Sequence, residues 1–164
     1  MSTPPDPAPS ASRAGKYLTF FLSGEEYGLE ILKVSEIIGL QPITRVPRTP
    51  DFIRGVINLR GKVIPITDLR RKFRMPAEEA QGSCIIVVQM QGVLTGIIVD
   101  RVSEVVAIAE ADIEDAPSFG ADVQTEFLLG IGKSGGRVKL LLDIDRVLAS
   151  SELAALEAID APVE

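Results

Sequence analysis

Short apolar runs alternate with glycine-containing turns along most of the chain, a pattern typical of a protein built from β-strands. We expect mostly β structure, with ten strands at residues 17–22, 26–31, 34–40, 53–58, 62–67, 84–90, 93–99, 102–108, 127–132 and 137–142. Short helical turns are expected at 68–73 and 143–148. Leu153, Leu156 and Ile159 recur every three residues and predict a C-terminal helix over about 151–160. Residues 1–15 are rich in proline and lack apolar periodicity, which predicts a disordered tail.

The strand pattern occurs twice. With a shift of 68 residues, segment 17–38 aligns with 85–106, and Val34-Ser35-Glu36 falls on Val102-Ser103-Glu104. With a shift of 75, Gly61 falls on Gly136. Each repeat, approximately 16–80 and 81–150, is small for an independent core. We therefore expect two five-stranded barrels packed together as a single domain over 16–164, since closing a barrel removes exposed sheet edges.

Residues 55–70 contain two apolar runs around the polar tip Asn58-Leu59-Arg60-Gly61, which predicts a β-hairpin. Gly61 is expected to supply a positive φ in the turn. Pro65 aligns with Leu140 of the other repeat and predicts that its strand is a sheet edge. The second repeat has Lys133-Ser134-Gly135 at the tip, so the cation Arg60 is not duplicated. A lone arginine in a turn can be a solvated tip, or it can be a binding residue.

Differences between two similar repeats indicate where function was added. Glu36 aligns with Glu104, but only Glu36 has an arginine at the hairpin tip of its own repeat. We hypothesise that Arg60 and Glu36 approach each other and set a polar rim beside an apolar patch from Val34 and Ile37. The alternative is an ordinary surface ion pair of little energetic consequence.

Composition excludes several classes of protein. The chain has 164 residues, 46% of them hydrophobic but only 5% aromatic, and a formal net charge of −6. An acidic chain with few stacking aromatics is a poor candidate for nucleic-acid binding. It lacks histidine and has one cysteine, so catalysis, a zinc site and other cofactors are not expected. No apolar stretch is long enough to suggest insertion into a membrane. Cys84 begins an apolar strand and is interpreted as a buried, inert thiol.

Three other motifs have simple structural interpretations. Gly130–Gly135 has the glycine spacing of a dinucleotide-binding fingerprint. That motif requires a helix after the glycines, whereas a strand is predicted there. The acidic run 110–115 lacks the spacing of a calcium loop and is interpreted as solvated surface. Glu25 and Glu26 are expected at an exposed turn, and Asp143 and Asp145 at a helix start.

The first repeat closely resembles the CheW family of bacterial chemotaxis coupling proteins. The resemblance is carried by the segments 26–34, 45–47, 52–61 and 65–70, and 96–105 continues it in the second repeat. It implies two intertwined SH3-like barrels and a non-enzymatic cytoplasmic adaptor. Such an adaptor joins chemoreceptor cytoplasmic tips to the regulatory domain of the histidine kinase CheA in membrane-associated arrays. That kinase domain shares the fold, so the kinase and further CheW copies can occupy rings together.

The resemblance also implies a receptor-binding groove between the barrels. Six residues stand at positions that the family associates with coupling: Val34, Glu36, Ile37, Arg60, Gly96 and Val102. The kinase contacts are not assigned to residues and are expected on the strand edges. The alternative is a coupling module excised from a larger signalling protein, such as a CheV-type adaptor or the kinase itself. The absence of a recognisable receiver or ATPase segment favours the separate adaptor.

Overall fold

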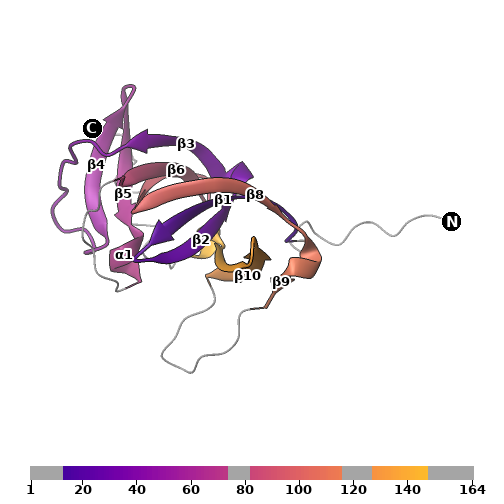
Figure 1. Cartoon of the computed structure of the whole chain (residues 1–164). Coiled ribbons are helices and arrows are strands. Elements are labelled where there is room, and N and C mark those ends of the chain that lie inside the picture. Colours follow the sequence, from indigo (N-terminus) through magenta and orange to yellow (C-terminus); the bar gives the residue numbers. More distant parts are fainter. Residues whose placement is uncertain (1–12, 74–81, 116–126, 148–164) are drawn as a thin grey trace.

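The computed structural model describes residues 13–73, 82–115 and 127–147, which form two mixed sheets (Figure 1). The first sheet has the order β8-β1-β2-β11-β10-β9. Its strands are β1 (Gly15–Leu22), β2 (Glu25–Glu30), β8 (Arg101–Ile108), β9 (Ile113–Glu114), β10 (Leu128–Ser134) and β11 (Arg137–Leu142). The second has the order β3-β6-β7-β5-β4. Its strands are β3 (Val34–Gly39), β4 (Ile53–Leu59), β5 (Lys62–Asp68), β6 (Cys84–Met90) and β7 (Val93–Val99).

The ten predicted strands are all present, with ends within two residues of those expected, and β9 was not predicted. The predicted helical turns correspond to α1 (Leu69–Lys72) and to the 3₁₀ turn η4 (Ile144–Arg146). Two further 3₁₀ turns, η2 (Ile31–Lys33) and η3 (Glu110–Asp112), follow β2 and β8. The predicted C-terminal helix and residues 1–12 of the predicted tail lie outside the described residues, and Gly15 already belongs to β1.

The two sheets do not coincide with the two sequence repeats. The six-stranded sheet takes β1 and β2 from the first repeat and the rest from the second. The five-stranded sheet takes β3, β4 and β5 from the first repeat and β6 and β7 from the second. Parallel pairing of β2 with β11 and of β5 with β7 connects the halves. The boundary near residue 80 therefore separates the repeats but not the two sheets, each of which contains strands from both repeats.

Three hydrophobic clusters make up the described core. The largest, the shared core, contains Phe20 and Leu29 of the first sheet together with Ile86 and Ile97 of the second. A second cluster is built entirely from the five-stranded sheet and contains Ile57, Ile64, Ile66, Ile85, Val87 and Ile98. A third belongs to the six-stranded sheet and contains Tyr17, Ile108, Ile113 and Leu141. Because the shared core takes side chains from both sheets, the two barrels pack as one unit.

A buried charge network holds α1 against the sheets. Asp68 caps α1 by accepting the backbone N–H of Arg70 at 3.0 Å. The Arg70 guanidinium is fully buried and donates to both Asp68 carboxylate oxygens, at 3.1 Å each. It also donates to Asp100 Oδ1 at 2.8 Å, and Asp100 Oδ2 accepts the Ser23 N–H. One arginine thus ties α1 to the β7–β8 junction and the β1–β2 turn.

The prediction that Glu26 is exposed is wrong. Glu26 is buried in β2, and Lys139 Nζ lies 3.3 Å from its Oε1 atom. Lys139 is also buried, on the neighbouring strand β11, and donates to the Ser134 carbonyl at 3.2 Å. Asp143, by contrast, caps η4 as predicted by accepting the Asp145 N–H. The burial of Glu26 is possible because a cation on the adjacent strand compensates its charge.

The prediction that Pro65 marks an edge strand is also wrong, since β5 lies between β7 and β4. Val56, opposite Pro65 on β4, exchanges both backbone hydrogen bonds with Thr44 instead. The Val56–Pro65 pair therefore has no backbone bonds across it, and the missing N–H of Pro65 points toward β7. The ladder with β7 begins only at Ile66, and the Pro65 carbonyl accepts the Thr95 hydroxyl at 3.0 Å. The proline is tolerated because it stands just before that ladder.

Candidate partner-binding surface

The predicted approach of Arg60 to Glu36 is confirmed. The Arg60 Nη1 atom donates to Glu36 Oε1 at 3.0 Å, and Nη2 donates to Oε2, so the pair is bidentate. These hydrogen bonds lower the pKa of the Glu36 carboxyl and raise that of Arg60. Glu36 lies on β3, and Arg60 lies at the β4–β5 tip. Because β3 and β4 are opposite ends of the five-stranded sheet, the ion pair joins the two ends of a curled sheet.

The hairpin tip fixes the position of the guanidinium. Leu59 pairs with Lys62, which leaves Arg60 and Gly61 as a two-residue loop. Both have positive φ, 51° and 87°, as in a type I′ turn. Gly61 was predicted to adopt this conformation, whereas arginine is uncommon in it. The Asn58 side chain accepts the Gly61 N–H at 2.8 Å and stabilises the turn.

A β-bulge at Ser35 places Val34 and Ile37 on the same face of β3. Val34 pairs with Val88 and Ile37 with Ile86, while Glu36 pairs with Val87. Side chains of paired residues share a face, so Val34 and Ile37 face the side of the shared core and Glu36 faces the opposite side. The ion pair and the apolar residues therefore lie on opposite faces of one strand, so the prediction of a polar rim beside the apolar patch is wrong. Ile37 is 46% exposed.

The second repeat contains the equivalent bulge on β8. Val102 pairs with Phe20 and Val105 with Leu18, so residues three apart again share a face. The buried Thr19 hydroxyl donates to the Glu104 carbonyl at 2.9 Å and accepts its N–H at 3.1 Å, which satisfies the backbone at the irregularity. The repeated Val-Ser-Glu sequence thus corresponds to a repeated backbone feature.

The two bulges put apolar side chains of two edge strands, β3 and β8, on the side of the shared core. We call these four residues the edge-strand patch: Val34, Ile37, Val102 and Val105. Val34 and Val102 are half-buried and both pack against the shared core. Ile37 and Val105 are more exposed, at 46% and 51%. The patch therefore lies at the border of the core shared by the two barrels.

Gly96 differs from the other predicted binding residues because it is buried in β7. A Cβ atom at this position would lie 2.7 Å from Ile66 Cδ1 and from Ile85 Cγ2, both in the cluster inside the five-stranded sheet. Gly96 therefore lets two isoleucines approach the backbone and presents no surface to a partner. Its influence on binding would have to act through packing of the barrel.

Val105 is the residue of the patch that the sequence-based set omitted. Its signal was the alignment of Val102 and Val105 with Val34 and Ile37, two apolar residues three apart within a predicted strand. Strict alternation would place such residues on opposite faces, so the spacing was itself evidence for a bulge.

No group of three or more His, Cys, Asp or Glu side chains in the described ranges is arranged to hold a metal ion. Cys84 is half-buried, and burial raises the pKa of its thiol. None of the described helices is long and apolar enough to cross a membrane. The edge-strand patch offers apolar contact and the Arg60–Glu36 pair offers charged groups, and both kinds of group occur in protein–protein interfaces.

Comparison with known proteins identifies the family. Residues 16–152 match the family model of the CheW-like domain. The chain belongs to the CheW-like family. It is 42% identical over 145 residues to the chemotaxis protein CheW of Klebsiella aerogenes, covering 88% of this chain and 87% of that one. It is 35% identical over 153 residues to the chemotaxis protein CheW of Rhizobium meliloti, covering 88% and 99%.

A solved relative has the same fold. The crystal structure of the scaffolding protein TtCheW from Thermoanaerobacter tengcongensis matches with a TM-score of 0.77 and 36% identity, covering 85% of this chain and 95% of that one. The predicted CheW resemblance and the mostly-β, double-barrel fold class are both confirmed. The CheW-like chain therefore belongs to a family of chemotaxis adaptors and scaffolds.

Proposed function

We propose that this CheW-like chain is a non-enzymatic adaptor that couples chemoreceptor cytoplasmic tips to the histidine kinase CheA. The observation that carries the proposal is the edge-strand patch. Two edge strands from different sheets expose the apolar residues Ile37 and Val105 beside the shared core. Exposed apolar side chains at a core border are suited to docking an apolar face of another protein.

In this proposal the receptor tip docks on the edge-strand patch, with Val34, Ile37 and Val102 acting as predicted and Val105 added. Arg60 and Glu36 hold the hairpin tip to β3 from the opposite face, which keeps the patch strand in position. Gly96 acts indirectly by allowing close packing beneath the same sheet. The kinase regulatory domain is proposed to bind at other strand edges. The adaptor would act in the cytoplasm and be recruited to membrane-associated arrays.

Reversing the charges of the ion pair tests the proposal. Glu36→Arg, Arg60→Glu and the double variant are compared for retention on an immobilised receptor cytoplasmic fragment and on the kinase regulatory domain. Each single variant should lose binding to at least one partner, since like charges replace an attractive pair. If either single variant binds both partners normally, the proposed role of this pair is wrong.

The double variant separates two roles of the pair. It restores opposite charges across the same positions, so recovery of binding indicates that the pair acts by holding β3 to the hairpin. Continued loss indicates direct contact with the partner. Lys133→Glu is the matched control, because Lys133 forms an exposed ion pair of 3.1 Å with Glu114 in the other sheet. This control should bind both partners like the unaltered chain.

A further inference from the structure

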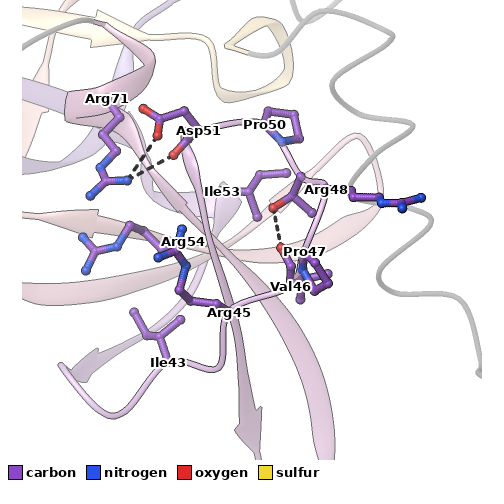
Figure 2. A pocket seen from close by; sticks show the side chains of 11 residues that line it. Ile43, Arg45, Val46, Pro47, Arg48, Pro50, Asp51, Ile53, Arg54 and Arg71 are labelled. Carbon is purple, nitrogen blue, oxygen red and sulfur yellow. Dashed lines mark hydrogen bonds and ion pairs between the residues drawn. The ribbon is translucent and has the colours of Figure 1, made fainter.

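A pocket of about 740 Å³ lies between the segment that follows β3 and the start of β4 (Figure 2). Its eleven lining residues include four arginines and a single acidic residue, Asp51. The formal charge of the lining is therefore +3, on a chain whose net charge is −6. None of the residues in the edge-strand patch, nor Glu36, Arg60 or Gly96, lines this pocket. The arginines are Arg45, Arg48, Arg54 and Arg71.

The four arginines are not equally engaged. Arg54 donates to the buried carboxylate of Asp68 at 3.2 Å, and Arg71 lies 3.5 Å from the Asp51 carboxylate and donates to its carbonyl. Arg45 and Arg48 are exposed, and the described part of the chain gives their side chains no ion pair. Figure 2 shows Arg45 beside Arg54, and Arg48 extending away from both at the rim. Arg45 is thus available to bind a ligand, and it lies beside Arg54, whose guanidinium is held by Asp68 (Figure 2).

The wall that carries these cations is tightly fixed. Thr44 exchanges two backbone hydrogen bonds with Val56, at 2.8 and 2.9 Å. Gly55 allows this approach, since a Cβ atom there would lie 2.1 Å from the Thr44 carbonyl oxygen. Arg48 has a φ of 65° at a turn closed by the Thr49 hydroxyl donating to the Val46 carbonyl. A conformation that favours glycine is thus occupied by an arginine, within a turn that the Thr49–Val46 hydrogen bond closes.

We propose that this arginine pocket binds an acidic peptide segment of a partner protein. A single oxyanion would fill only a small part of about 740 Å³. The lining also contains apolar side chains, including Ile43, Val46 and Ile53, which suit the aliphatic residues of a peptide. Asp51 at the wall would repel a compact, doubly charged phosphate more than a carboxylate. Arginine forks bind carboxylates in a defined geometry, as Arg60 does with Glu36 elsewhere in this chain.

The test uses the full chain and two labelled peptides, one of alternating Glu and Leu and one with Gln in place of Glu. Fluorescence anisotropy should detect the Glu peptide, with binding that weakens as salt is added. Arg45→Gln should weaken it about tenfold, and Arg48→Gln less, because Arg48 lies at the rim. The control Lys16→Gln/Lys133→Gln removes two exposed charges outside the pocket and should bind normally.

Three results would overturn the proposal. The first is equal binding of the Gln peptide. The second is unchanged binding by Arg45→Gln and Arg48→Gln, each confirmed as folded by its thermal transition. The third is displacement of the peptide by a lower concentration of pyrophosphate than of free Glu peptide, which would assign the pocket to a phosphate-bearing small molecule. The proposal does not rest on the receptor–kinase function, because no receptor or kinase is used in the measurement.

Discussion

Truncating the two exposed residues of the edge-strand patch should weaken receptor docking by a calculable amount. Ile37 is 46% exposed and Val105 is 51% exposed, so about half of each side chain is available for burial by a partner. Complete burial of an aliphatic side chain is worth about 1.5–3 kcal/mol. Burial of the exposed half by a partner is therefore worth about 0.7–1.5 kcal/mol of binding free energy for each residue, or about 3- to 12-fold in Kd. Ile37→Ala/Val105→Ala should weaken docking by about 10- to 150-fold if the effects add.

Titration calorimetry with a receptor cytoplasmic fragment measures these changes. Val138→Ala is the control, because Val138 is similarly exposed, at 58%, but lies on β11 outside the patch. Its Kd should stay within a factor of two. All variants should keep a cooperative thermal transition, with only a modest loss of stability, because about half of each side chain is already buried in the folded chain. An unchanged Kd for the double variant would refute the assignment of the receptor to this patch.

The remaining predictions concern buried groups. Gly96→Val should lower the free energy of unfolding by about 1–3 kcal/mol in urea titration, since the new side chain overlaps the core of the five-stranded sheet. An unchanged urea midpoint would contradict the tight packing of Ile66 and Ile85 against Gly96. Asp68→Ala should cost about 3–5 kcal/mol by the same assay, because it removes a carboxylate that accepts two hydrogen bonds from the buried Arg70 guanidinium; a loss below 1 kcal/mol would contradict this. Burial raises the pKa of Tyr17 and of Tyr27 to about 12, so phenolate absorbance should appear near pH 12. Phenols titrate near 10 in an unfolded chain, so this contribution to stability is full below pH 10 and is lost as the pH rises to about 12. Phenolate absorbance at pH 10 in the folded chain would count against the stated burial.

The strands were predictable from sequence because their signals are local. Apolar runs ended by glycine turns located β6 and β7 at their observed ends, and Asp68 marked the start of α1. The Arg60–Glu36 pair was also predictable, since comparing the repeats isolated an arginine without a counterpart. These inferences required only residue types and spacing.

Features that depend on pairing between distant strands were not predictable in the same way. Glu26 looked like a turn residue because its compensating Lys139 lies on a strand of the other repeat. Pro65 looked like an edge residue because the start of the β5–β7 ladder was unknown. The bulge at Ser35 changes which face Ile37 occupies, and it is defined only by the register with β6. Sequence position therefore gave three of the four residues of the edge-strand patch but not their common face.

A three-component capture experiment measures whether one chain bridges a receptor and the kinase. The receptor cytoplasmic fragment is immobilised, and retention of the kinase regulatory domain is measured with and without the full chain. Retention of the kinase domain should depend on the chain and should fall with Ile37→Ala/Val105→Ala. If the chain retains neither partner, or if kinase retention is the same without the chain, the adaptor function is contradicted.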